Sequence, residues 1–349
     1  MKHLNELPVP EPVTLPMNFF EHLRISTAKP EAIPDAVVKI HGMPISTRKN
    51  LTLLSGASKA GKTAITSVLC AGGIQTYGMD GSASIEVAEN VDGKAVIHID
   101  TEQSRYHHQN NLRSIVKRAN LTCEPEYYQT YNIRELPLTQ YKIFLESLLE
   151  KADEIFGGVH LMIIDGIADF IVSVNDEVES NSIVSYFEKL AIKYDTPIIF
   201  VLHVNPGTEK ERGHLGSQLQ RKCESVLSIK KEGDTSVLEA KFLRNGASGQ
   251  FSPVYYQFDA NKGYHTFMDA CEADGRNRAL RELAEQVFTQ AITYVTAMKR
   301  IEEIGKCVDR TARRKLKDML DIGVVEKQEV GNSVYYQLAQ TLQDEETPF

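Results

Sequence analysis

The segment GASKAGKT at residues 56–63 constrains the fold of this chain more than any other part of its sequence. It fits the pattern G-x-x-x-x-G-K-S/T and lies between an apolar run, Leu51–Ser55, and a helix-like stretch from Ala64 to Gly72. Glycines let such a loop curl its backbone N–H groups around an anion, and the helix directs its positive N-terminal end at the same point. The sequence therefore predicts a loop that binds nucleotide phosphates, formed by Gly56, Ala57, Ser58, Lys59, Ala60, Gly61, Lys62 and Thr63.

Two residues of this loop and one distant carboxylate are predicted to hold ATP with Mg²⁺. Lys62 is expected to reach the β- and γ-phosphates, and the Thr63 hydroxyl is expected to bind the metal. In HLMIIDG, residues 160–166, four apolar residues end in Asp165. Such a strand delivers a carboxylate at its C-terminal end, where it can complete the Mg²⁺ shell. An ordinary strand terminator is the alternative interpretation of Asp165.

Hydrolysis also needs a base that activates water, and this base does not follow the metal carboxylate directly, because residue 166 is glycine. The segment AVIHIDTEQS, residues 95–104, offers Glu102 just beyond a buried strand that ends at Asp100. The C-terminal ends of strands line the ligand crevice of a doubly wound sheet, so Glu102 is predicted to lie near the γ-phosphate. A solvated loop carboxylate is the alternative.

Strand-like and helix-like segments alternate from about residue 48 to 266, which predicts an α/β fold with a mostly parallel sheet covered on both faces. Helical patterns follow Gly61, Ser104, Pro137 and Ser180. The strand candidates are Leu51–Ser55, Ala95–Asp100, Leu161–Asp165, Ile198–His203, Ser225–Lys230 and Ser236–Leu243.

The other segments are expected to surround this domain. Residues 1–47 hold seven of the 13 prolines and are interpreted as an arm with little core of its own. The polar segment 267–279 is interpreted as a linker, 280–340 as a second domain and 341–349 as an acidic tail.

Residues 299–338 have the outline of a winged helix-turn-helix, with two helical patterns followed by a hairpin signal. From Lys306 to Lys317 there are six basic residues and one acidic residue, a net charge of +5 in a chain of net charge −8. This balance suits duplex DNA phosphates. Winged folds also serve as protein-interaction modules, and that alternative stays open.

Four segments, GASKAGKT, HIDTEQS, LMIIDG and VLHVNPG with the following RGHLGS, resemble the RecA-like core of hexameric replicative helicases of the plasmid RepA type and their relatives on mobile elements. The resemblance covers roughly residues 48–266. It implies that Glu102 is the catalytic base, and that His203 or Asn205 senses the γ-phosphate. It also implies that a basic residue near Arg244 reaches the ATP of the neighbouring subunit as an arginine finger, so that the protein is a homo-oligomer, possibly a hexamer.

In RecA-like motors the region matched by residues 205–217 faces the central channel and touches single-stranded DNA. Lys210, Arg212 and His214 could contact phosphates, but Glu209 and Glu211 are interleaved, so a solvated loop is the alternative. The other candidate channel loop, residues 172–180, is acidic and is expected to repel a phosphate backbone.

The leading interpretation is an ATPase that acts on DNA as a RepA-type helicase. The alternative is an ATP switch that does not translocate, such as a replication or recombination accessory or a regulator, whose winged helix binds DNA. The apolar runs are too short for a membrane span, and the five scattered cysteines suggest reduced thiols in a cytoplasm.

Two weaker signals concern pairs of rings. The adjacent His107 and His108 are interpreted as surface residues of a helix. Tyr255 and Tyr256 are interpreted as packing aromatics, with stacking on a nucleotide or DNA base as the alternative.

Overall fold

The computed structural model describes residues 23–75, 84–205, 211–244, 251–268, 270–330 and 333–339. The chain divides into two units, Met1–Pro34 and Asp35–Phe349. In the first unit the described residues, 23–34, are all exposed, including the apolar Leu23, Ile25 and Ile33. The first 22 residues of the expected arm and the expected tail at 341–349 lie outside the described residues.

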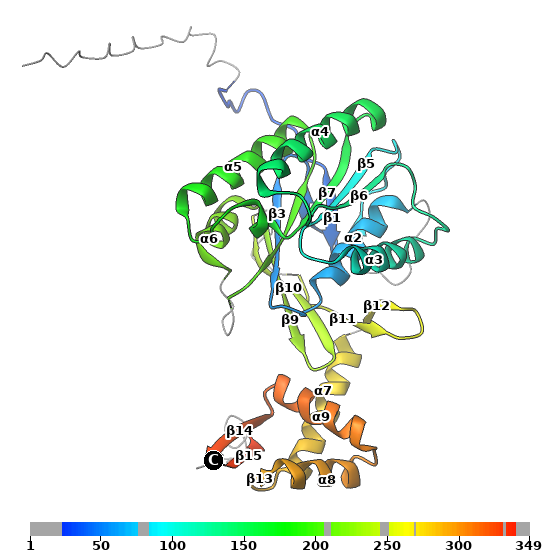
Figure 1. The fold of residues 1–349 in the computed structure, drawn as a ribbon, viewed down its shortest axis with the longest axis vertical. Coiled ribbons are helices and arrows are strands. Elements are labelled where there is room, and N and C mark those ends of the chain that lie inside the picture. The colour runs from blue at the N-terminus through cyan, green and yellow to red at the C-terminus, as the bar shows by residue number, and fades with distance from the viewer. Residues whose placement is uncertain are drawn as a thin grey trace, which may run out of the picture. The chain divides into compact units, whose positions relative to one another are not determined.

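A nine-stranded sheet forms the centre of the second unit (Figure 1). Its six strands from β9 to β6 are parallel, and β10, β11 and β12 extend one edge in antiparallel pairing, so the mostly parallel α/β sheet that the sequence predicts is confirmed. In the order of their hydrogen-bonded neighbours, the strands are β12 (Tyr264–Met268), β11 (Val254–Asp259), β10 (Thr235–Leu243), β9 (Ser225–Glu232), β3 (Leu51–Gly56), β8 (Ile198–His203), β7 (Val159–Asp165), β5 (Ala95–Asp100) and β6 (Tyr128–Asn132).

Helices cover both faces of this sheet, because its central strands are apolar on both sides. Every residue of β3, β5 and β7 is buried. One hydrophobic core packs α2 (Lys62–Ile74) and α3 (Arg105–Arg118) on one face. A second core packs α4 (Leu138–Phe156), α5 (Glu177–Lys193) and α6 (Gly213–Lys222) on the other face. Figure 1 shows the two groups of helices on either side of the strands.

Strands β6, β11 and β12 are not among those predicted from the sequence. They lie at or near the two edges of the sheet, and their burial alternates or is only partial. Edge strands lack the continuous apolar runs that mark central strands, so their sequences resemble loops. The six strands that were predicted all form, and β5 and β8 have the predicted bounds.

The expectation of an arm with little core of its own is wrong for residues 36–47. These residues form β1 (Ala36–Ile40) and β2 (Met43–Thr47), which join β4 (Ile85–Val87) in a small sheet of order β2-β1-β4. Val37, Val38, Ile40 and Ile45 are buried in the core beneath α2 and α3. Pro44 concealed this sheet, since it sits in an edge strand, the position where a sheet tolerates proline.

The expectation of a linker at residues 267–279 is also wrong. Strand β12 extends to Met268, and α7 runs from Ala270 to Val287, so the polar segment forms the first half of a helix. The second half of α7 carries Leu280, Ala284 and Val287 into the C-terminal core, which explains why a polar sequence is helical there.

The C-terminal residues form the two helices and the hairpin that the sequence predicts. Helix α8 (Tyr294–Ile304) and α9 (Asp309–Asp321) pack on a sheet of order β13-β15-β14, formed by Ile292–Thr293, Ser333–Leu338 and Val325–Val330. Ala312, Leu316 and Met319 form the buried stripe of α9. Among the helices of the described residues, none combines the length and apolarity that a membrane crossing requires.

Candidate active site

The predicted phosphate loop connects the end of β3 to the start of α2, and two glycines fix its course. A Cβ on Gly56 would lie 2.6 Å from the Ile229 carbonyl oxygen. Gly61 has a φ of 107°, and a Cβ there would lie 2.7 Å from the Ser236 hydroxyl and 3.1 Å from the Tyr256 ring. Side chains at these two positions would therefore displace the loop from the strands that support it.

Tyr256 supports this loop from the neighbouring hairpin. Its side chain is buried, and its hydroxyl donates a hydrogen bond of 3.2 Å to the Gly61 carbonyl. Tyr256 is therefore a packing aromatic, as predicted, and β11 has a direct connection to the start of α2.

Lys62 connects the loop to the end of β8. Its Nζ donates to the carbonyl oxygens of Gly56 and Ala57 at 2.9 and 2.8 Å and lies 3.1 Å from Nδ1 of His203. Burial lowers the pKa of Lys62, while the negative charges of Glu102 and Asp165 act in the opposite direction. The ammonium is thus held at the rim of the loop by backbone groups that a phosphate could replace.

His203 links Lys62 to Glu102, so the structure brings these three predicted site residues together. Nε2 of His203 lies 3.0 Å from Oε2 of Glu102. A ring protonated on Nε2 accepts from Lys62 and donates to Glu102, which fits both contacts. Of the two sensor candidates, His203 is in the site, while the Asn205 amide points to the Glu211 carbonyl at 3.5 Å.

Glu102 has the ionisation that a general base requires. The hydrogen bond from His203 lowers its pKa, burial opposes this, and the charges of His203 and Lys62 lower it further. The carboxylate is therefore ionised at neutral pH. Its side chain is 38% exposed, which leaves it accessible to water.

Gly166 explains why the base does not follow Asp165. Its φ is 107°, and a Cβ on it would lie 2.0 Å from the Thr101 hydroxyl and 3.1 Å from Cγ of Glu102. The segment that carries Glu102 occupies the space that a side chain at position 166 would need.

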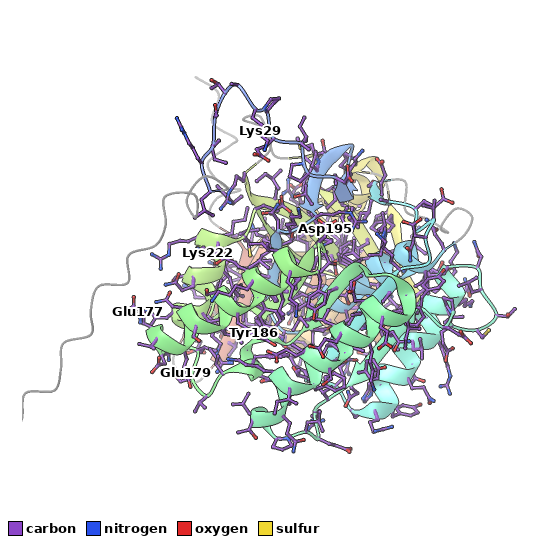
Figure 2. All side chains as sticks on the ribbon, turned by 90° about the horizontal axis from the view of Figure 1, so that it is seen from above. Lys29, Glu177, Glu179, Tyr186, Asp195 and Lys222 are labelled. Atoms are coloured by element: carbon purple, nitrogen blue, oxygen red, sulfur yellow. The ribbon has the colours of Figure 1, made fainter. Side chains whose placement is uncertain are left out.

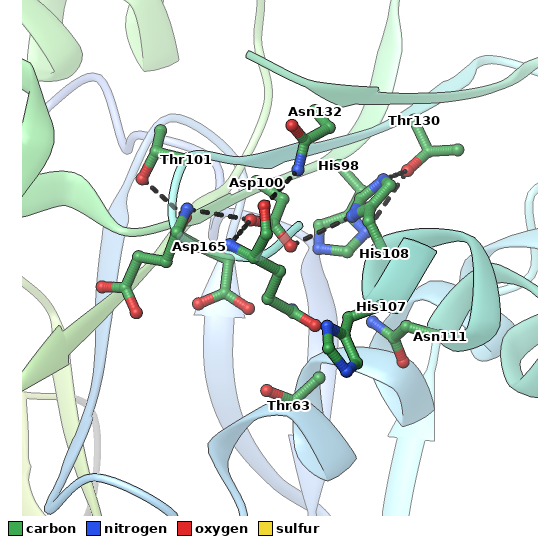
Figure 3. A network of polar contacts seen from close by, with 12 residues as sticks. Thr63, His98, Asp100, Thr101, His107, His108, Asn111, Thr130, Asn132 and Asp165 are labelled. Carbon is green, nitrogen blue, oxygen red and sulfur yellow. Dashed lines mark hydrogen bonds and ion pairs between the residues drawn. The ribbon is translucent and has the colours of Figure 1, made fainter. Parts of the chain in front are cut away.

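Asp165 has the surroundings of a carboxylate that binds a cation. It is 6% exposed, and its Oδ2 has no hydrogen-bond partner among the described residues. Burial, together with the negative charges of Asp100 and Glu102, raises its pKa to about 7. Figure 3 shows Asp165 directed toward Thr63 at the start of α2. A hydroxyl and an unsatisfied carboxylate are oxygen ligands of the kind that Mg²⁺ takes, so these residues fit the metal.

Arg244 lies far from these groups. It follows β10, whose last residue, Leu243, pairs with Ser225 at the start of β9. Its backbone N–H donates to the Glu224 carbonyl at 2.7 Å. The phosphate loop lies at the opposite, C-terminal ends of the parallel strands, so Arg244 does not reach the site of its own chain.

The expectation of a solvated, mixed-charge loop at residues 205–217 is wrong for Glu211. This carboxylate is buried, accepts from Lys241 Nζ at 2.8 Å and from the Ser55 hydroxyl at 3.2 Å. Arg212 and His214 are exposed, while Lys210 and Glu209 lie outside the described residues. The surface of the described part of this loop is thus more basic than its sequence indicates.

The acidic segment 172–180 lies against the start of α6, since the Leu215 N–H donates to the Val174 carbonyl at 3.0 Å. Two of its acidic groups have local structural roles. Asp176 caps α5 by accepting from the Glu179 N–H at 2.8 Å, and Glu179 accepts from the Val172 N–H at 3.1 Å. Figure 2 shows Glu179 with Glu177 at the outer end of α5.

The interpretation of His108 as a surface residue is wrong. His107 is exposed, but His108 is 7% exposed, and its Nδ1 lies 3.0 Å from Oδ2 of Asp100. Helical spacing was the missed signal, because His108 shares one face of α3 with Leu112, Ile115 and Ala119, which pack in the core.

The sheet order, the phosphate loop and the carboxylate at the end of β7 define a RecA-like P-loop ATPase. A family model described as an AAA domain matches residues 25–209, more than half of the chain, and the protein belongs to this family.

Solved structures with a similar fold include a KaiC-like protein from the hyperthermophilic archaeon Pyrococcus horikoshii OT3, with 12% identity and a TM-score of 0.45 over 66% of this chain and 93% of the other. A second solved structure, described as an ATPase domain, is similar as well, with 12% identity and a TM-score of 0.44 over 64% of this chain and 86% of the other. No curated protein matches the chain.

The first prediction concerns Glu102. Glu102→Gln keeps the size and the contact with His203 but removes the basic oxygen, so ATP affinity should persist while turnover falls on the order of 10²-fold or more. Steady-state ATPase assays with a separate nucleotide-binding titration measure both quantities. Normal turnover in this variant would place the base elsewhere.

The second prediction concerns the stability of the metal-free protein. Because the pKa of Asp165 is raised from 3.8 to about 7, its ionisation opposes folding above pH 7, and this effect disappears as the pH falls toward 4. Asp165→Asn should therefore raise the free energy of unfolding at pH 8 by a few kcal/mol, on the order expected for a shift of this size, and by less at pH 5.

Thermal melts in EDTA measure this difference, with Asp153→Asn, an exposed carboxylate on α4, as the control. Added Mg²⁺ should stabilise the wild type more than Asp165→Asn. A variant that is less stable at pH 8, or whose gain does not depend on pH, would contradict the assignment.

Proposed function

We propose that this protein is an ATP-hydrolysing motor that acts on DNA, of the kind found in RepA-type replicative helicases of plasmids and mobile elements. The observation that carries the proposal is the chain of contacts from Lys62 through His203 to Glu102, next to the unsatisfied carboxylate of Asp165.

Each residue of the site has one task in this proposal. Residues 56–63 bind the phosphates through their N–H groups, and Lys62 turns from the carbonyls of its own loop to the phosphate oxygens. Thr63 and Asp165 hold Mg²⁺, which neutralises charge on the phosphates when it is bound. Glu102 accepts a proton from the attacking water. His203 exchanges its contact with Lys62 for one with the γ-phosphate and thereby reports which nucleotide is bound.

Completion of the site requires a second copy of the chain. Arg244 follows β10 at the edge of the sheet opposite the phosphate loop, and its guanidinium donates to the Arg221 carbonyl at 3.4 Å on the surface. A guanidinium at this place can serve a neighbouring subunit, where it would stabilise the charge of the transferring phosphoryl group. A homo-oligomer, possibly a hexamer, follows from this proposal.

The third prediction tests the shared site. Arg244→Ala should bind ATP normally but hydrolyse it roughly 10³-fold more slowly, because a supplied arginine contributes about that much to related reactions. Mixing this variant with Glu102→Gln should restore part of the turnover, since a mixed interface pairs an intact base with an intact arginine.

Wild-type turnover per subunit should also rise with protein concentration as the oligomer forms. Turnover that is independent of dilution, together with a mixture no more active than its two components, would exclude a shared site.

The C-terminal helices supply the contact with duplex DNA in this proposal, as a winged helix. Several basic residues of α9 have partners within the protein: Arg313 pairs with Asp309 at 2.9 Å, Arg314 pairs with Asp234 at 3.4 Å, and Lys315 donates to the Gly305 carbonyl at 3.3 Å. The exposed Lys306, Arg310 and Lys317 are the residues we assign to DNA phosphates.

The fourth prediction follows from counterion release. Replacing Lys306, Arg310 and Lys317 by alanine should weaken duplex binding and lower the slope of log affinity against log salt by about 0.9 for each phosphate that is no longer neutralised. Fluorescence anisotropy at several salt concentrations measures the slope. The matched control replaces three exposed lysines of α4 and α5, Lys151, Lys189 and Lys193, by alanine. An unchanged slope in the α9 variant would move the anchor to the region of Arg212 and His214.

A second candidate function is an ATP switch that binds DNA without translocating. The carboxylates of residues 172–180 favour it, because they lie against the start of α6, beside Arg212, where a motor would guide single-stranded DNA. Strand displacement on a forked DNA separates the two functions. A motor should release the strand only with hydrolysable ATP, whereas a switch should bind the fork and leave it paired.

A further inference from the structure

Asp100 has a buried carboxylate at the end of β5, two residues before Glu102, and both of its oxygens are occupied. Oδ1 accepts from the backbone N–H groups of Glu102 at 2.9 Å and of Gln103 at 2.8 Å. This double contact closes a tight turn directly after the strand. The direction in which Glu102 leaves the sheet therefore depends on where the Asp100 carboxylate points.

The second oxygen of Asp100 is held from two other elements. Nδ1 of His108, on α3, lies 3.0 Å from Oδ2 of Asp100, and Nε2 of His108 lies 2.9 Å from the Thr130 hydroxyl on β6. A ring that donates from Nδ1 accepts from Thr130 at Nε2, so both nitrogens are satisfied. Figure 3 shows this chain of contacts from Thr130 through His108 to Asp100.

The charges around the pair favour an ionised, well-ordered carboxylate. Burial alone would raise the pKa of Asp100, but the hydrogen bonds from His108 and from the Gln103 N–H outweigh it, and the pKa lies below its usual value. The nearby His98 ring, 5.2 Å from the His108 ring, stays neutral because burial and the charge of His108 lower its pKa to about 3. A neutral neighbour does not compete with His108 for the carboxylate.

From this geometry we infer that Asp100 and His108 are positioning residues, which hold the turn that aims Glu102 at the nucleotide. His108 fixes the Asp100 carboxylate, and the carboxylate fixes the N–H groups of Glu102 and Gln103. The inference rests on the proposed role of Glu102 as the base. A purely structural His–Asp pair would affect folding alone, whereas a positioning pair affects the chemical step in folded protein.

The test compares two substitutions of His108 in the full-length protein. His108→Leu removes the donor to Asp100 and should lower kcat about 10- to 100-fold, the size of effect expected when a reacting group is misplaced by about 1 Å. KM and the affinity for a fluorescent ATP analogue should stay within about twofold. His108→Asn presents an amide N–H at nearly the same place and should recover most of the loss.

Two controls separate positioning from general damage. His107→Leu makes the same exchange one residue earlier, on an exposed ring that contacts Ser104, and should leave kcat unchanged. His108→Leu combined with Glu102→Gln should be no slower than Glu102→Gln alone, because two residues that act through one group do not add.

Hydrogen exchange provides a readout that does not depend on turnover. The amides of Glu102 and Gln103 should exchange at least about tenfold faster in His108→Leu than in wild type, because these are the N–H groups that Asp100 holds. Unchanged exchange at these amides, or a kcat loss that His108→Asn does not recover, would overturn the inference. Normal turnover in Glu102→Gln would instead refute the proposed base, and the exchange data would still decide whether His108 holds the turn.

Discussion

The candidate site depends on the parallel pairing of β5 with β7, which places Asp100 beside Asp165. This pairing concentrates negative charge, since Glu102 follows on the next turn and Thr101 donates to Asp169 at 2.8 Å. Like charges at this separation repel one another strongly in a buried environment. The positive groups that face them, Lys62 and His203, are therefore as necessary to the folded state as they are to the proposed chemistry.

The carboxylates are distributed so that each has a different compensation. The backbone and His108 satisfy Asp100, His203 satisfies Glu102, and Asp165 has an oxygen without a partner among the described residues. This asymmetry assigns different chemistry to each: a fixed positioning group, an accessible base and a cation ligand. The raised pKa of Asp165 is the electrostatic cost of keeping one carboxylate ready for a metal.

The sequence predicted the parts of the molecule whose signals are local. The phosphate loop, the six central strands and the carboxylates at the ends of β5 and β7 could be located because apolar runs and glycine spacing mark them. The edge strands and the first half of α7 could not, since their burial depends on distant partners such as the C-terminal core. Pro44 indicated a loop, but it occupies an edge strand whose neighbours only the fold reveals.

The functional residues show the same division. Glu102 could be identified from its place after a strand, whereas the contact of His108 with Asp100 joins a helix to a strand end and leaves no short motif. Glu211 appeared to be a surface charge among other charges, and only the packing of Lys241 and Ser55 around it removes it from the surface. Charge counted along a sequence therefore misjudges the surface of the loop that follows β8.

A crystal structure of the protein with Mg²⁺ and an ATP analogue that mimics the transferring phosphoryl group would test the central claim most directly. The account predicts that Lys62 leaves the carbonyls of Gly56 and Ala57 for the phosphates and that the metal binds Thr63 and Asp165. It also predicts that Glu102 holds a water in line with the γ-phosphate, while the turn at Asp100 keeps its present contacts. A water held by another residue, with Glu102 directed away from the nucleotide, would contradict the account.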